Sequence, residues 1–167
     1  IGWCDWSSDV CSSDLFNELA AKSSGLVTIS YVPTDRDLRK LKKDFASMSE
    51  LTPFISGFTG MAFGIDHIGQ NLILKIAALS SPDSVTAAAN TLRMMKTGYQ
   101  QQFDAMLNMY AAQMPPVVGQ QVRQVWNSIS IQSEGSALVM RADIPVSLLD
   151  ILIAQMGAAM GSGGSEE

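Results

Sequence analysis

A hydrophobic pattern that occurs twice, 66 residues apart, constrains the fold of this chain more than any other feature. In the first copy Met61, Phe63 and Ile65 alternate with small or polar residues, a turn follows over 67–71, and alternation resumes at Leu72. Period-2 alternation on both sides of a glycine turn is typical of a β-hairpin with one buried face. The first copy therefore predicts two antiparallel strands.

The second copy repeats the apolar positions and the turn. Adding 66 to the numbers of the first hairpin leads to Ile129, Ile131, Gly135, Leu138, Met140, Arg141, Ala142 and Ile144. A helix start signal follows each hairpin: Ser81-Pro82 after the first, and Ser147 with capping-box spacing to Asp150 after the second. These signals predict tandem ββα repeats.

Two ββα units can bury their apolar faces by joining their hairpins into one sheet. A further strand is expected over 26–32, where Val27, Ile29 and Tyr31 alternate with Thr and Ser before Pro33. We therefore predict an α+β fold with an antiparallel sheet of about five strands from tandem ββα repeats and with helices packed on one face.

Helices are expected where apolar residues recur three or four positions apart. The ranges are 35–50, 82–113, a short helix at 118–126, and 146–160. Gly98 predicts a kink or break in the longest helix, and Thr52-Pro53 predicts a loop. The last helix is apolar nearly all round but shorter than the roughly 20 residues needed to span a bilayer, so no transmembrane segment is expected.

The first 15 residues are expected to be an artefactual segment. Residues 5–15 resemble the translation of a widely used sequencing adaptor, and both cysteines, Cys4 and Cys11, lie in the segment 1–15. We therefore expect a single, N-terminally truncated α+β domain over 16–160 and a flexible tail over 161–167, with neither a disulfide nor a metal pair.

The charge balance argues against a nucleic-acid partner. Without the three acids of residues 1–15, the 16 acidic residues become 13 against 11 basic ones, and the formal net charge moves from −5 to −2. A nucleic-acid-binding domain usually carries a strong basic excess.

The sequence contains few candidates for catalysis. His67 is the single histidine and lies in an expected turn, and the acids Asp66, Asp104, Glu134 and Asp143 share no spacing that would pair two carboxylates. Nucleophile-elbow and phosphate-loop motifs are absent. The methionine-rich helix could offer thioethers to monovalent copper, but methionine beside aromatic residues is more typical of core or contact surface. We therefore predict no enzyme activity, catalytic residue, cofactor or metal.

Two surfaces remain as candidates for binding. A possible anion-binding face on the first helix consists of Arg36, Arg39, Lys40 and Lys43. Because Asp35, Asp37 and Asp44 lie among these cations, a solvated face with local charge pairs is the favoured interpretation.

The second candidate is a possible apolar contact surface that consists of Ile73, Leu79, Met106 and Met109. The outward side of the sheet is polar in the second hairpin but apolar in the first. We expect the apolar part to meet a missing N-terminal domain of the same protein or a partner, which the sequence does not identify.

With these elements placed, the chain after Gly25 resembles the C-terminal part of uncharacterised, often exported bacterial proteins built from serial ββα modules. The resemblance rests on 26–33, 72–76, 126–131, 134–144 and Pro145 with the apolar run 146–149. It implies a location in the periplasm or cell envelope and a non-catalytic role, and it supplies no site residues.

Three hypotheses for function follow. The leading one is a non-enzymatic binding or structural module of an exported bacterial protein. The second is a carrier of lipid or another apolar ligand, because the last helix is apolar and the longest is rich in methionine. The third is binding to an anionic surface through the basic helix.

Overall fold

The computed structural model describes residues 17, 21–22, 25–110 and 113–161, with the side chains of 152 and 155–161 excepted. In chain order the elements are β1 (Val27–Tyr31), α2 (Asp35–Asp44), the 3-10 turn η1 (Ser49–Leu51), α3 (Thr52–Ser56), β2 (Gly60–Ile68), β3 (Asn71–Leu79), α4 (Pro82–Tyr110), α5 (Pro116–Ser128), β4 (Ser130–Glu134), β5 (Ala137–Pro145) and α6 (Val146–Gly161). The predicted adaptor segment 1–15 lies outside the described residues, as does the expected tail apart from Gly161, which ends α6.

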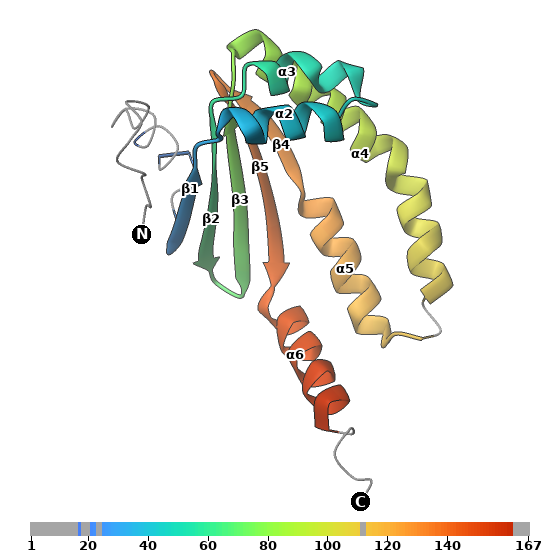
Figure 1. The fold of residues 1–167 in the computed structure, drawn as a ribbon. Coiled ribbons are helices and arrows are strands. Elements are labelled where there is room, and N and C mark those ends of the chain that lie inside the picture. Colours follow the sequence, from blue (N-terminus) through green and yellow to red (C-terminus); the bar gives the residue numbers. More distant parts are fainter. Residues whose placement is uncertain (1–16, 18–20, 23–24, 111–112, 162–167) are drawn as a thin grey trace, which may run out of the picture.

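The five strands form one antiparallel sheet in the order β1-β2-β3-β5-β4 (Figure 1). The hairpins β2–β3 and β4–β5 are joined by pairing of β3 with β5, so Phe63 and Ile131 lie in the same sheet. The predicted α+β class and the five-stranded antiparallel sheet are therefore confirmed.

Both hairpins turn through two residues. The loops are Gly69-Gln70 and Gly135-Ser136, and the glycines have φ values of +62° and +63°. A positive φ at the first loop residue alone is the signature of a type II′ turn, which matches the twist of the flanking strands. The prediction of a turn over 67–71 was too long, because backbone pairing continues to Ile68 and resumes at Asn71.

The two hairpins are related by a pseudo-twofold axis that passes between Lys75 and Arg141. These residues pair across β3 and β5 and are 66 positions apart. Within the hairpins Gly64 of β2 pairs with Lys75, and Ser130 of β4 pairs with Arg141, and the members of these two pairs are again 66 positions apart.

Hydrogen bonds outside the strands follow the same relation. The Ser80 amide donates to the Ser136 carbonyl, and the Val146 amide donates to the Gln70 carbonyl, both at 2.9 Å. Each end of one hairpin is thereby tied to the turn of the other, so the four-stranded unit β2-β3-β5-β4 is symmetric in register and in its end contacts.

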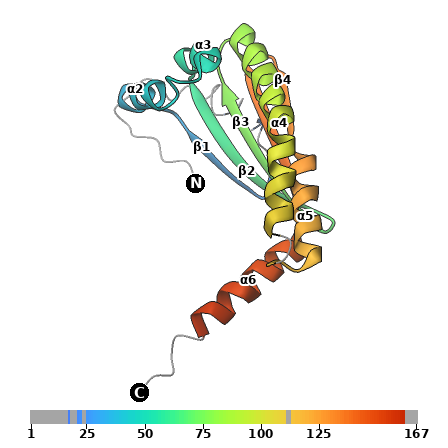
Figure 2. The same ribbon diagram turned by 90° about the vertical axis from the view of Figure 1, so that its right-hand side faces the viewer.

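The core lies between α2, α3 and α4 and one face of the sheet (Figure 2). Leu51, Ile55, Val85, Ala88, Ala89 and Leu138 form its buried cluster, with Leu41, Phe54 and Leu92 packed against it. Alternate strand residues reach this face because successive side chains of a strand point to opposite sides. The helix α5 packs on β5 and α4 beside this layer.

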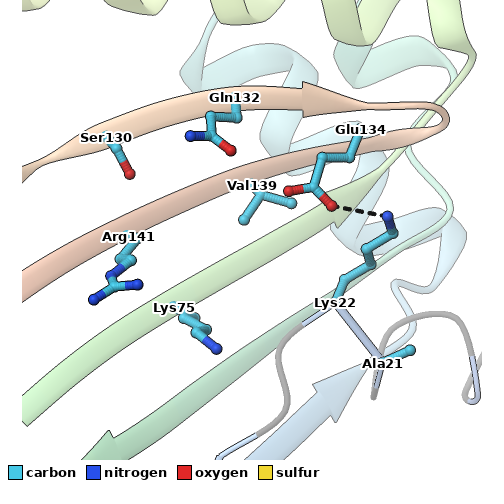
Figure 3. A pocket seen from close by; sticks show the side chains of 8 residues that line it. All are labelled: Ala21, Lys22, Lys75, Ser130, Gln132, Glu134, Val139 and Arg141. Atoms are coloured by element: carbon cyan, nitrogen blue, oxygen red, sulfur yellow. Dashed lines mark hydrogen bonds and ion pairs between the residues drawn. The ribbon is translucent and has the colours of Figure 1, made fainter. Parts of the chain in front are cut away.

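The opposite face of the sheet is partly buried. Ala62, Leu79 and Ala137 form a second buried cluster, with Val139 packed against it. The helical residues Ala21 and Lys22 lie on this side of the sheet, and the Lys22 side chain reaches Glu134 of β4 (Figure 3).

Three expectations about the helices differ from the structure. The helix expected over 35–50 ends at Asp44, where the Phe45 amide caps it by donating to the Leu41 carbonyl at 2.9 Å. The loop expected at Thr52-Pro53 is the short helix α3, because proline, which has no N–H, suits a first helical turn. The break expected at Gly98 is absent, since one glycine costs a helix only about 1 kcal/mol.

The last helix begins without a connecting loop. Helix α6 starts at Val146, directly after β5, so Ser147 lies inside the first turn and is not the predicted N-cap. The Ser147 hydroxyl instead accepts a hydrogen bond from the Gln121 side-chain amide at 2.6 Å. In the part of the chain that the structure describes, no helix combines the length and the apolar character required for a membrane span.

Candidate functional site

An apolar cavity of about 290 Å³ lies between the helices and the sheet. Helices α2, α3 and α4 supply one side, and strands β2, β3 and β5 supply the other. The lining residues are Leu41, Phe45, Leu51, Phe54, Ile55, Phe58, Met61, Ile76, Ala78, Ala88, Leu92, Leu138 and Met140. Since every one of them is apolar, the cavity offers contacts to hydrocarbon and no side-chain hydrogen bond.

Strand register explains the floor of this cavity. Met61, Ala78 and Leu138 lie side by side on β2, β3 and β5, and Ile76 pairs with Met140 one layer further along. Their side chains share the face that the helices cover. Ala78 in the floor and Ala88 in the roof are small, so space remains between the larger side chains around them.

A hydroxyl network fixes α3 in the roof. The Ser80 hydroxyl, at the end of β3, donates to the Phe54 carbonyl at 2.9 Å and lies 3.0 Å from the Ser84 hydroxyl. A Cβ atom added at Gly57 would lie only 2.7 Å from the Ser80 hydroxyl oxygen, so glycine is needed for this close approach. The roof is therefore anchored to both the sheet and α4.

A second, polar hollow of about 570 Å³ lies on the opposite face of the sheet (Figure 3). Its lining residues are Ala21, Lys22, Lys75, Ser130, Gln132, Glu134, Val139 and Arg141. Lys75 and Arg141 are cross-strand neighbours at the pseudo-twofold axis.

Ion pairs compensate charge in this polar hollow. The Lys22 ammonium lies 2.8 Å from the Glu134 carboxylate. The Arg141 guanidinium donates to both oxygens of Asp143 at 2.8 and 3.3 Å, and this hydrogen bonding raises the pKa of Arg141. Because the partners belong to the protein itself, the hollow provides its own counterions.

The predicted anion-binding face is present as an exposed surface. Arg36, Arg39, Lys40 and Lys43 are all exposed on α2. Among the described residues the ion pairs join Lys22 to Glu134, Arg123 to Asp104 and Arg141 to Asp143, and none involves α2. No direct ion pair is therefore formed within α2, although, besides a hydrogen bond from Thr34, the charge of Arg36 contributes to lowering the pKa of Asp37.

One acid of α2 has a structural role. Asp37 closes a capping box, because its carboxylate accepts from the Thr34 amide at 2.9 Å and from the Thr34 hydroxyl at 2.6 Å. The hydrogen bond from the Thr34 side chain has the largest effect on Asp37, and together with the one from Tyr31 it lowers the pKa of Asp37 to about 2. The same contact with Asp37 raises the pKa of Tyr31 to about 12.

The predicted apolar contact surface is divided by the fold. Ile73 and Leu79 are each only 2 % exposed, so they belong to the interior and are not accessible to a partner. Met106 and Met109 are exposed on α4. Strand alternation identified the face of Ile73 and Leu79 but could not show that this face is covered.

The titratable residues considered for catalysis do not converge. His67 is exposed, and its backbone amide donates to the Asp66 carboxylate at 2.8 Å. The pKa of Asp104 is lowered by a hydrogen bond from Gln100 and further by Arg123. Within the described ranges no three His, Cys, Asp or Glu side chains are grouped as a metal site would require.

The cavity residues were not predicted as a site. The sequence predicts a loop at Thr52-Pro53, next to Phe54, and places Ala88 and Leu92 only within the helix expected over 82–113. The available signal was the small residues Ala78 and Ala88 within apolar patterns, but it has meaning only once strand register is known. Comparison of the chain with protein-family models, curated proteins and solved structures found no match.

Proposed function

We propose that this protein is a non-enzymatic binding module that holds a small apolar ligand, or the apolar part of a larger one, in the cavity beneath α2, α3 and α4. The observation that carries the proposal is the lining of thirteen residues, all apolar. Ligand sites are usually concave and mostly apolar, with few polar groups to fix orientation. A cavity without polar groups favours binding driven by burial of hydrocarbon surface.

The volume limits the class of ligand. An apolar cavity of about 150 Å³ can hold benzene, and sites for drug-sized ligands measure about 300–1,000 Å³. The 290 Å³ found here suits an aromatic ring system or part of one acyl chain rather than a whole phospholipid.

The placement of the titratable groups supports a non-enzymatic role. Asp37 and Asp104 have lowered pKa values, and each is engaged in hydrogen bonds that stabilise a helix or join two helices. Neither carboxylate lines the apolar cavity. A general acid or base needs access to the group on which it acts.

A cavity-filling variant tests the proposal. Binding of N-phenyl-1-naphthylamine, a neutral probe that fluoresces in apolar surroundings, would be titrated with the whole chain. We expect saturable binding, weakened at least about tenfold by Ala88→Leu because the larger side chain occupies the cavity. Ala78→Leu fills the same space from the sheet side and serves if the first variant does not fold.

The matched control is Ala105→Leu, which adds the same atoms at an exposed position of α4. It should leave the affinity for the probe unchanged. Equal binding by folded cavity-filled variants and the original chain would overturn the proposal, as would binding that never saturates. If the probe binds as expected, native mass spectrometry of the protein purified from cells would show whether it retains a lipid.

The cellular setting rests on the resemblance to exported bacterial ββα proteins. We infer that the two ββα units are tandem repeats, supported by the constant offset of 66 residues in strand pairs and end contacts. A periplasmic or envelope location follows only from the resemblance. A longer reading frame from the same source that encodes no export signal upstream would argue against it.

A further inference from the structure

The helices cover only part of one face of the sheet. Helix α2 lies at one end of β1 and β2, and no helix runs along the rest of β1 in Figure 2. Val27 and Ile29 of β1 are 52 % and 59 % exposed, and their partners Ile65 and Phe63 on β2 are only half-buried. These four residues define the open β1–β2 face.

The pseudo-twofold axis identifies α6 as the counterpart of α4. Helix α4 follows β3 and packs on β4 and β5, the other hairpin. The equivalent helix after β5 is α6, and its symmetry-equivalent place is on β2 and β3, which shares β2 with the open face but already lies beneath α2 and α3. Its main contacts are instead with α5 and the end of β5, and it points away from the sheet (Figure 1).

The junction at Val146 explains why α6 does not fold back. Two residues, Ser80 and Ser81, separate β3 from α4, whereas α6 begins at the residue after β5. The first turn of α6 is then held by the Val146–Gln70 hydrogen bond, by the Gln121–Ser147 hydrogen bond and by burial of Leu148. To reach the open face of its own chain, α6 would have to break these contacts.

The composition of α6 suits packing on an apolar surface. Asp150 is the only charged residue between 146 and 161, and Ile153 is 63 % exposed. A helix about 10 Å wide covers two strands spaced about 4.8 Å apart, and 16 residues extend for about 24 Å, shorter than a nine-residue strand. One helix can therefore cover the open β1–β2 face.

We propose that α6 of a second copy of this chain packs on the open β1–β2 face, and that the exchange is reciprocal. Each copy supplies one apolar arm and one apolar face, so two copies close with twofold symmetry and leave neither exposed. The arm keeps its anchored first turn, and the open β1–β2 face is covered by the partner's helix. None of the four residues of the open β1–β2 face lines the proposed ligand cavity, although Phe63 pairs with the cavity residue Ile76.

Cross-linking between two single-cysteine proteins tests this exchange. Cys4 and Cys11 would first be changed to serine. Ile29→Cys protein and Ile153→Cys protein would then be mixed and treated with a short bismaleimide. We expect a cross-linked dimer in the mixture, and none when Met94→Cys, an exposed position on α4, replaces Ile153→Cys.

Sedimentation velocity at tens of micromolar provides the second measurement. We expect a dimer that Ile153→Glu converts to a folded monomer. A monomeric original chain would overturn the proposal. So would a cross-link formed within one chain carrying both cysteines, since that result means that α6 closes on its own sheet. A dimer without the Ile29–Ile153 cross-link would also overturn it, because the interface then lies elsewhere.

Discussion

Replacing Gly135 by alanine tests the turn geometry on which the sheet depends. Gly135 has φ +63°, and an added Cβ would meet no atom within 4 Å. The cost must therefore come from the backbone conformation rather than from a steric clash with neighbours. Gly69, with φ +62° and equally open surroundings, provides an independent copy of the same experiment.

The magnitude follows from two opposing effects. Holding an L-residue in this sparsely populated backbone region costs roughly 1–3 kcal/mol, and replacing glycine by alanine returns about 0.4–1 kcal/mol by restricting the unfolded chain. Each variant should therefore lose about 1 kcal/mol in the free energy of unfolding. The double variant should lose about 2 kcal/mol, because the two turns lie at opposite ends of the sheet.

Gly98→Ala is the matched control. Gly98 lies within α4, and a Cβ there also meets nothing within 4 Å, so alanine should stabilise the protein by up to about 1 kcal/mol. Urea denaturation followed by circular dichroism would measure all four variants. If Gly69→Ala and Gly135→Ala proved neutral or stabilising, the type II′ turns would be refuted.

Three further predictions concern the core and the first helix. Leu138→Ala should lower the free energy of unfolding by about 2–5 kcal/mol in the same urea assay, because the side chain is buried beside the cavity; a loss below about 1 kcal/mol would contradict this packing. Thr34→Ala should cost about 1 kcal/mol by removing the cap of α2, while thermal unfolding unchanged from the original chain would show that the capping box is not formed. The pKa of Asp37 is lowered from 3.8 to about 2, so its contribution is complete above about pH 4 and disappears as the pH falls through about 2. Asp37→Asn should therefore weaken the acid dependence of stability in that window, and an identical pH profile would exclude the contribution.

The sheet could be predicted well from the sequence because the strand and turn signals lie within each hairpin and the pattern occurs twice. Alternation around Phe63 and Ile131 identified the strands, and the offset of Gly69 and Gly135 identified equivalent turns. Joining the hairpins required only that their apolar faces be buried together. The pairing of β3 with β5 then satisfied that requirement.

Helix boundaries and the site depended on contacts that a sequence pattern does not contain. The spacing of Phe45 and Met48 continued the apolar stripe of α2, yet the chain turns there so that α3 can pack against α4. The cavity lining combines Ala78 of β3 with Ala88 of α4, two small residues far apart in the sequence. Similarly, period-2 alternation could not show that Ile73 is buried on the outward face.

Backbone nuclear Overhauser contacts between β3 and β5 test the central claim most directly. That claim is that the two hairpins form one sheet about an axis at Lys75 and Arg141. The account predicts cross-strand contacts between Leu74 and Ala142 and between Ile76 and Met140, in the register of a single antiparallel ladder. Contacts confined to each hairpin, or a ladder shifted by even one residue, would contradict it.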